Sequence, residues 1–291
     1  LLTKLVFLLL FAHNEPCSYL VGIIQTRVYR MDALTTNTLG KITILCVVLF
    51  AGMLLCFHLG RLWGRRQDGT GDSNDAGTTT GTIFALLGLL VAFLFSGAYS
   101  RFEGRRDIIV QEANAIGTVY LRVDLLPQVL QPAFRAQMRE YTLLRGDFFN
   151  QLQHGRKAVN ENLAQTTRLQ TEIWHQAVVG SSGPEYNSAR MLLIPALNEM
   201  FDIASTRTDA VKTHPPPLIF YTLMGIALLC AWMGGYAARK SPRSMIIHSA
   251  VFAFAIAMMV YLIADIEFPS QGWVNLSQVN QTIVDMAASM K

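Results

Sequence analysis

The chain has 291 residues, of which 52% are hydrophobic and 15% charged, and its formal net charge is +4. A soluble domain carries about 25% charged residues, so this deficit favours a membrane protein with a modest polar part. The basic residues lie at the ends of apolar segments rather than on one face, which excludes the usual electrostatic footprint of a nucleic-acid-binding protein.

Four long apolar segments predict transmembrane helices, at residues 41–60, 81–100, 218–238 and 245–264. A helix rises about 1.5 Å per residue, so about 20 residues reach the thickness of one hydrocarbon core. The second segment is uncharged from Ile83 to Tyr99. This uncharged part contains Gly88 and Gly97 and no proline, which is typical of a membrane helix packed against a neighbour. A buried helix of a soluble protein would need a large apolar surround, and here the surround is three more segments of the same kind.

The region between the second and third apolar segments is polar and amphipathic. Apolar residues recur at helical spacing in the continuation of the second segment and in the stretches 132–151, 158–179 and 185–212. We therefore predict an all-α, polytopic membrane protein with four transmembrane helices and a helical bundle inserted between spans two and three. The linker Gln67–Thr80 is rich in Gly, Asp, Ser and Thr, so no regular element is expected there.

The predicted domain boundaries follow from these segments. We expect an N-terminal extension at 1–38, a first transmembrane hairpin at 39–100, the bundle at 101–214, a second transmembrane hairpin at 215–265 and a C-terminal tail at 266–291. The first twelve residues are apolar but too few to span a bilayer, and no small-residue cleavage site follows them. Met31 begins a cleaner sequence, so residues 1–30 are expected to lie outside the working protein.

Several stretches of the chain resemble a known family. Phe84–Arg106, Glu112–Pro127, Leu193–Pro217 and Ile263–Gln278 together resemble the bacterial bestrophin-like proteins, a group without an assigned function. In addition, LLGLLVAF followed by AYSRFEGRR is similar to the second membrane helix of the bestrophin ion channels.

The resemblance implies a function. Bestrophins form pentameric ion channels around the second helix, and apolar residues one turn apart line their narrow neck. The matching positions here are Leu89, Phe93 and Gly97, although Gly97 differs from the bulky neck residue of that family. This implies an oligomeric ion channel whose second span lines the pore. The alternative hypothesis is a non-conducting membrane scaffold or sensor that acts through its helical bundle.

Charged residues lie at the end of two predicted spans, on the same side of the membrane. Arg101, Glu103 and Arg105 follow the second span, and Asp265 and Glu267 follow the fourth. A carboxylate at a helix C-terminus is disfavoured by the macrodipole by a few tenths of a kcal/mol. We therefore expect a membrane-proximal polar cluster in which the carboxylates, Asp265 in particular, pair with the arginines. A cation-binding mouth is the alternative.

Two polar clusters lie near the membrane ends of the helix that leaves it and the helix that returns to it. The first contains Arg101, Glu103, Arg105 and Arg106, with Glu112 and Asn114 beyond, and the second contains Asn198, Glu199, Asp202, Arg207 and Asp209. As antiparallel neighbours these helices could form salt bridges close to the membrane. The alternatives are solvated helix faces and a vestibule that attracts ions.

No signature of chemistry is present elsewhere. The sequence contains no GxSxG, HExxH or P-loop motif, its histidines are scattered, and its four cysteines form no CxxC pair. We therefore predict no catalytic residue, no metal site, no cofactor and no enzymatic activity. The expected partners are the lipid bilayer, further copies of the chain and an inorganic ion, with no nucleic acid. The expected location is the bacterial inner membrane, as a multi-pass protein.

The orientation in the membrane has two readings. The short loops after the first and third spans are basic, so the positive-inside rule places them in the cytoplasm and the bundle outside. The resemblance to bestrophins implies the reverse, because the large helical domain of that family is cytosolic.

Overall fold

The computed structural model describes residues 38–66, 73–240, 245–269 and 272–290. Within these ranges every regular element is a helix, and four helices are long and apolar enough to cross a membrane. The predicted all-α fold with four transmembrane helices is therefore confirmed. The predicted extension, residues 1–38, lies outside the described part of the chain except for its last residue.

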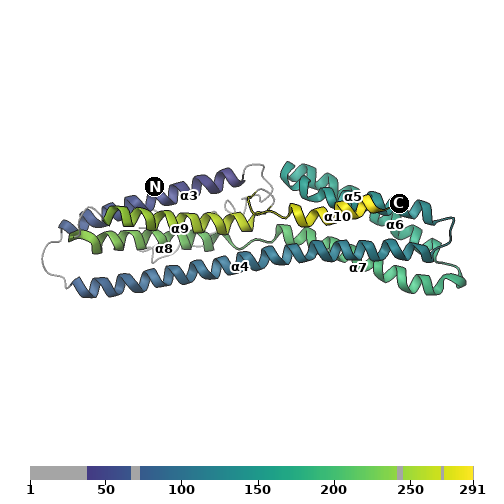
Figure 1. The fold of residues 1–291 in the computed structure, drawn as a ribbon, viewed down its shortest axis with the longest axis horizontal. Coiled ribbons are helices and arrows are strands. Elements are labelled where there is room, and N and C mark those ends of the chain that lie inside the picture. The colour runs from purple at the N-terminus through teal and green to yellow at the C-terminus, as the bar shows by residue number, and fades with distance from the viewer. Residues whose placement is uncertain (1–37, 67–72, 241–244, 270–271, 291) are drawn as a thin grey trace, which may run out of the picture. The chain divides into compact units, whose positions relative to one another are not determined.

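The described residues divide into two compact units. The membrane unit contains Leu39–Ala98 and Pro215–Ala264, and the bundle unit contains Tyr99–His214 and the chain from Asp265 onward. One unbroken helix, α4 (Ser73–Arg122), contributes residues to both units (Figure 1).

The membrane unit is built from four apolar helices. α8 begins at Pro217, where a proline is tolerated because the first helical turn needs no backbone donor. Besides the first part of α4, the helices are α3 (Thr38–Arg66), α8 (Pro217–Ala237), the short 3-10 helix η3 (Ala238–Lys240) and α9 (Met245–Glu267) up to Ala264.

Two glycines bring α3 and α8 into close backbone contact. A Cβ atom placed on Gly60 would lie 2.1 Å from the carbonyl oxygen of Trp232, and one placed on Gly235 would lie 2.0 Å from that of Phe57. No larger residue fits at these distances. Close packing of small residues is a principal source of helix association in a membrane, where burial of apolar surface supplies no driving force.

The linker prediction is wrong for part of Gln67–Thr80. Residues 67–72 lie outside the described ranges, but α4 begins at Ser73, seven residues before Thr80. Ser73 and Asp75 belong to the residue types favoured at helix starts. Once the long apolar helix exists, extending it costs far less than nucleating a new one, so polar residues of modest propensity join it.

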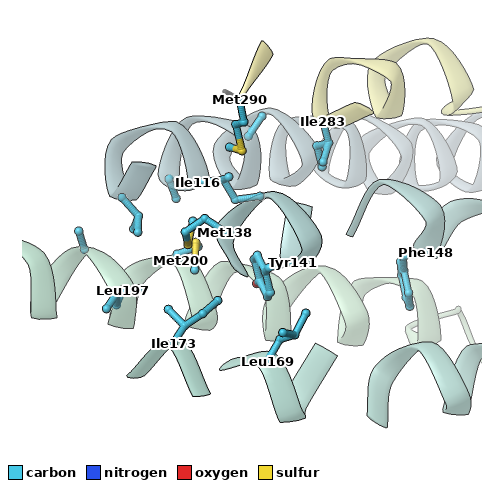
Figure 2. Close-up of a cluster of buried hydrophobic side chains, with 14 of the residues drawn as sticks. Ile116, Met138, Tyr141, Phe148, Leu169, Ile173, Leu197, Met200, Ile283 and Met290 are labelled. Atoms are coloured by element: carbon cyan, nitrogen blue, oxygen red, sulfur yellow. The ribbon is translucent and has the colours of Figure 1, made fainter. Parts of the chain in front are cut away.

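The bundle unit contains the three helices expected after α4 and one that was not expected. The expected helices are α5 (Gln131–His154), α6 (Arg156–Gly180) and α7 (Asn187–Lys212), and the unexpected one is α10 (Ser277–Ser289). Two short 3-10 helices, η1 (Val123–Leu125) and η2 (Pro184–Tyr186), precede α5 and α7. Apolar side chains from all five helices meet in one cluster (Figure 2), which includes Ile116, Met138, Ile173, Leu197 and Ile283.

The predicted C-terminal tail, residues 266–291, thus contains a core element of the bundle. α10 packs on α5, where Gly146 leaves room for Val284: a Cβ atom on Gly146 would lie 2.9 Å from the Val284 side chain. Ile283 and Ala287 are completely buried. These two residues are one turn apart on one face of α10. This short amphipathic pattern is the signal in the sequence that indicates a buried helix here.

Candidate functional site

Glu267, at the C-terminal end of α9, is the centre of a charged cluster. Its carboxylate is fully buried and accepts hydrogen bonds from Arg101 at 2.7 and 2.9 Å and from Arg105 at 3.3 Å. Arg101 and Arg105 are four residues apart on α4, which places both side chains on one face of that helix. His214 Nδ1 lies 3.1 Å from the same carboxylate. We call these four residues the Glu267 cluster.

Arg105 also binds the ends of two helices. Its guanidinium donates to the carbonyl oxygens of Ala210 and Thr213, at 3.1 and 2.9 Å, and to that of Glu267 at 3.0 Å. The last carbonyls of a helix have no partner within the helix, and a cation near them is favoured by the macrodipole. Arg105 therefore joins the C-terminal ends of α7 and α9 to α4.

The expected pairing of Asp265 with an arginine is wrong. Asp265 is buried, and its two carboxylate oxygens accept hydrogen bonds from the backbone N–H groups of Trp273 and Val274, at 3.1 and 2.9 Å. Residues two apart on a helix point about 200° apart, so Asp265 and Glu267 face different neighbours. Glu103 does not join the cluster either, because it bonds to Arg106 on the exposed face of α4.

His214 is a cluster member that sequence reasoning missed. Its ring lies on that of Phe268, with the centroids 4.7 Å apart, and the structure gives Nε2 no hydrogen-bond partner although the atom is buried. A histidine directly before three prolines has no recognisable spacing to Glu267, so only the folded chain brings the two together.

A second charged group lies inside the bundle, and it is completely enclosed. Glu112 on α4 accepts hydrogen bonds from Arg145 on α5 and from Arg207 on α7, the latter at 2.7 Å. Arg207 also donates to Asn280 on α10 at 2.7 Å, and Asn280 donates to the carbonyl oxygen of Gly146 at 2.8 Å. We call Glu112, Arg145, Arg207 and Asn280 the bundle network. It connects four helices through buried polar side chains.

The bundle network was visible in part from the sequence. The Glu112–Arg207 salt bridge joins one residue from each of the two polar clusters in the sequence, while Arg145 and Asn280 were missed. Arg145 lies one turn after Tyr141, on the apolar stripe of α5, and this position predicts a buried side chain. A charged residue on an apolar stripe therefore signals a buried ion pair.

Electrostatics keep Glu112 ionised. Burial opposes ionisation, but the positive charges of Arg145 and Arg207 outweigh that effect and lower the pKa of the Glu112 carboxyl. The same burial raises the pKa of Tyr141 to about 12. Both guanidinium groups also lie over the ring of Phe148, 5.0 and 5.4 Å from its centroid, which adds a cation–π contribution.

The proposed neck residues lie on the outer face of α4. Leu89 is 52% exposed and Phe93 is 66% exposed, while Gly97 is half-buried. The buried face of this helix segment is formed instead by Leu87, Val91 and Ala98. Leu89 and Phe93 therefore belong to no core of the single chain, so their face is free to contact lipid, a pore or another copy.

The geometry defines a polytopic all-α membrane protein with a charged cluster where α4 and α9 end their apolar segments. The model of the Bestrophin-like domain family matches residues 45–280, and the chain belongs to this family. No curated protein sequence matches it. Among the described residues, no group of His, Cys, Asp and Glu has the arrangement to hold a metal ion.

Solved structures show the same fold. Two variants of a bacterial bestrophin homologue from Klebsiella pneumoniae match with TM-scores of 0.62 and 0.63, at 14% and 15% sequence identity. The matches cover 85% and 86% of this chain and 99% and 98% of the homologue. At this identity the likeness is one of fold, and it spans nearly the whole homologue.

Proposed function

We propose that the chain is one subunit of a homo-oligomeric ion channel of the bacterial inner membrane, in which the outer face of α4 lines the pore. The observation that carries this proposal is the exposure of Leu89 and Phe93. A ring of such side chains from several copies would form a hydrophobic constriction, which can gate an ion pathway by dewetting. Gly97 would widen the pore one turn further along α4.

Exposed apolar side chains on the bundle support assembly of several copies. Leu121, Val129 and Met191 are 72%, 89% and 78% exposed, although they lie in the polar region beyond the apolar segments. Large apolar side chains exposed outside a membrane are candidates for contact with another protein surface. In the proposed channel a neighbouring subunit covers them.

The same exposed side chains also fit a second candidate function. A membrane scaffold or sensor would use Leu121, Val129 and Met191 to bind a different protein, and it would conduct no ions. Its bundle surface would then stay uncovered in the purified chain, which would remain a monomer.

Reconstitution separates the two functions. The purified protein should run as a homo-oligomer by light scattering and should pass current in a planar bilayer. Met191→Glu should weaken the assembly and lower the current. Lys157→Glu serves as the control, because the Lys157 side chain is 91% exposed and pairs with Glu161, which is itself 63% exposed. A monomer without current would contradict the channel and favour the scaffold.

A further inference from the structure

Trp273 is an exposed aromatic residue in the chain segment after α9. It is 88% exposed, so the bundle buries almost none of its ring. A tryptophan side chain offers an area of roughly 150–250 Å² with an apolar body and one polar N–H group. Such a side chain normally lies in a core, in an interface between proteins or at the boundary between lipid and water.

The backbone around Trp273 is held in place by Asp265. The N–H groups of Trp273 and Val274 both donate to the Asp265 carboxylate, at 3.1 and 2.9 Å. Gly272 lies against the same residue: a Cβ atom at this position would be 2.6 Å from Asp265 Oδ1. The Trp273 backbone is therefore fixed at the level of Asp265, while its side chain points away from the protein.

The level of Asp265 coincides with the end of a membrane span. Asp265 follows directly after the apolar part of α9, Met245–Ala264, and the next carboxylate, Glu267, binds Arg101 and Arg105, the residues that end the apolar segment of α4. We therefore expect the hydrocarbon core to end near Asp265, which brings Trp273 to the level of the polar headgroup layer. Tryptophan is enriched in this layer.

We propose that Trp273 inserts into the headgroup layer of the lipid bilayer and fixes the depth of α9 there, with Asp265 holding the loop that presents it. The partner is the lipid–water interface, and the indole ring supplies an apolar body for the acyl boundary and an N–H donor for headgroup oxygens. This role depends on the membrane spans alone, so it holds whether or not the protein conducts ions.

Fluorescence in proteoliposomes tests the proposal. The emission of Trp273 is obtained as the difference between the native protein and Trp273→Phe, a substitution that the exposure of the ring makes harmless to folding. Phospholipids brominated near the headgroup should quench most of this difference emission, and lipids brominated near the chain end should quench less of it. Trp174 on α6, in the bundle, gives the matched control: the difference between the native protein and Trp174→Phe should be insensitive to both lipids.

Two outcomes would overturn the proposal. Difference emission that brominated lipid leaves unchanged but aqueous acrylamide quenches would place the ring in water. Emission that neither agent quenches would place it in a contact between subunits. Asp265→Ala, with Trp273 intact, should reduce the lipid quenching because the loop is released. Quenching as strong as in the native protein would show that Asp265 does not position the ring.

Discussion

Arg101 places two hydrogen bonds, of 2.7 and 2.9 Å, on a single carboxylate oxygen of Glu267, and these two residues lie 166 positions apart in the sequence. The bond connects the start of the bundle part of α4 with the end of α9. Glu267 is fully buried, so the pair is shielded from water on its side. Arg105 and His214 contact the same carboxylate and hold it in place.

Removing the Glu267 carboxylate should strongly destabilise the bundle unit. Glu267→Ala leaves Arg105 buried without its counter-charge, and breaking a buried ion pair in this way costs about 3–5 kcal/mol. Thermal unfolding in detergent, followed by circular dichroism, measures the loss. The control is Glu103→Ala, which removes an exposed pair and should change stability by less than about 1 kcal/mol. Equal losses in the two variants would show that the Glu267 cluster contributes no more to stability than an exposed ion pair.

Charge reversal separates the roles of the two carboxylates of α9. Asp265→Lys should destabilise the protein, because the N–H groups of Trp273 and Val274 lose their acceptor. Arg101→Glu should not rescue this variant, since Asp265 does not bind Arg101 in the structure. Recovery of the melting temperature in the double variant would show that Asp265 and Arg101 pair after all.

The bundle network should make stability depend on acid pH. The pKa of Glu112 is lowered in the folded state, so its contribution is complete above the ordinary glutamate pKa of about 4.3 and is lost as the pH falls below that value. At neutral pH Glu112→Gln should be less stable than the native protein by about 3–5 kcal/mol, because Arg145 and Arg207 stay buried without a counter-charge. The difference should shrink as the pH falls below 4. A difference that is constant with pH, measured by denaturant unfolding, would contradict this role of the carboxylate.

The contact between α3 and α8 should tolerate no side chain at Gly235. Gly235→Ala places a methyl group against the carbonyl of Phe57 and should destabilise the membrane unit by about 1–3 kcal/mol, the usual cost of overpacking. Gly225 lies on the same helix, and a Cβ atom there meets nothing within 4 Å. Gly225→Ala is therefore the matched control and should leave the melting temperature unchanged. Equal behaviour of the two alanine variants would mean that the helices do not approach at Gly235.

Much of the fold could be predicted from local pattern. An uncharged apolar segment long enough to cross a bilayer, such as Ile83–Tyr99, has few alternatives to a membrane helix, and the helices of the bundle follow from apolar residues at helical spacing. α10 was missed because its apolar face is short, and the start of α4 was missed because its first residues have low helix propensity.

For the charged clusters, the sequence predicted that ion pairs form but not which residues pair. The positions of the charges at the ends of the two spans indicate that Arg101 and Arg105 pair with a carboxylate. The choice between Asp265 and Glu267, however, depends on the rotation of α9 about its axis. That rotation is set by packing over the whole helix. Likewise, the contacts of Glu112 with Arg145 and Arg207 require three helices in register, which no single stretch of sequence encodes.

The conductance of Phe93→Ala in a planar bilayer shows whether Phe93 lines a pore. The matched control is Phe254→Ala, since Phe254 is also an exposed phenylalanine of a membrane helix, 58% against 66%, but lies on α9. If α4 lines the pore, the native protein conducts, Phe93→Ala raises the current by widening the constriction, and Phe254→Ala leaves it unchanged. Absence of current from all three proteins, or equal currents from the two variants, would contradict a pore lined by α4.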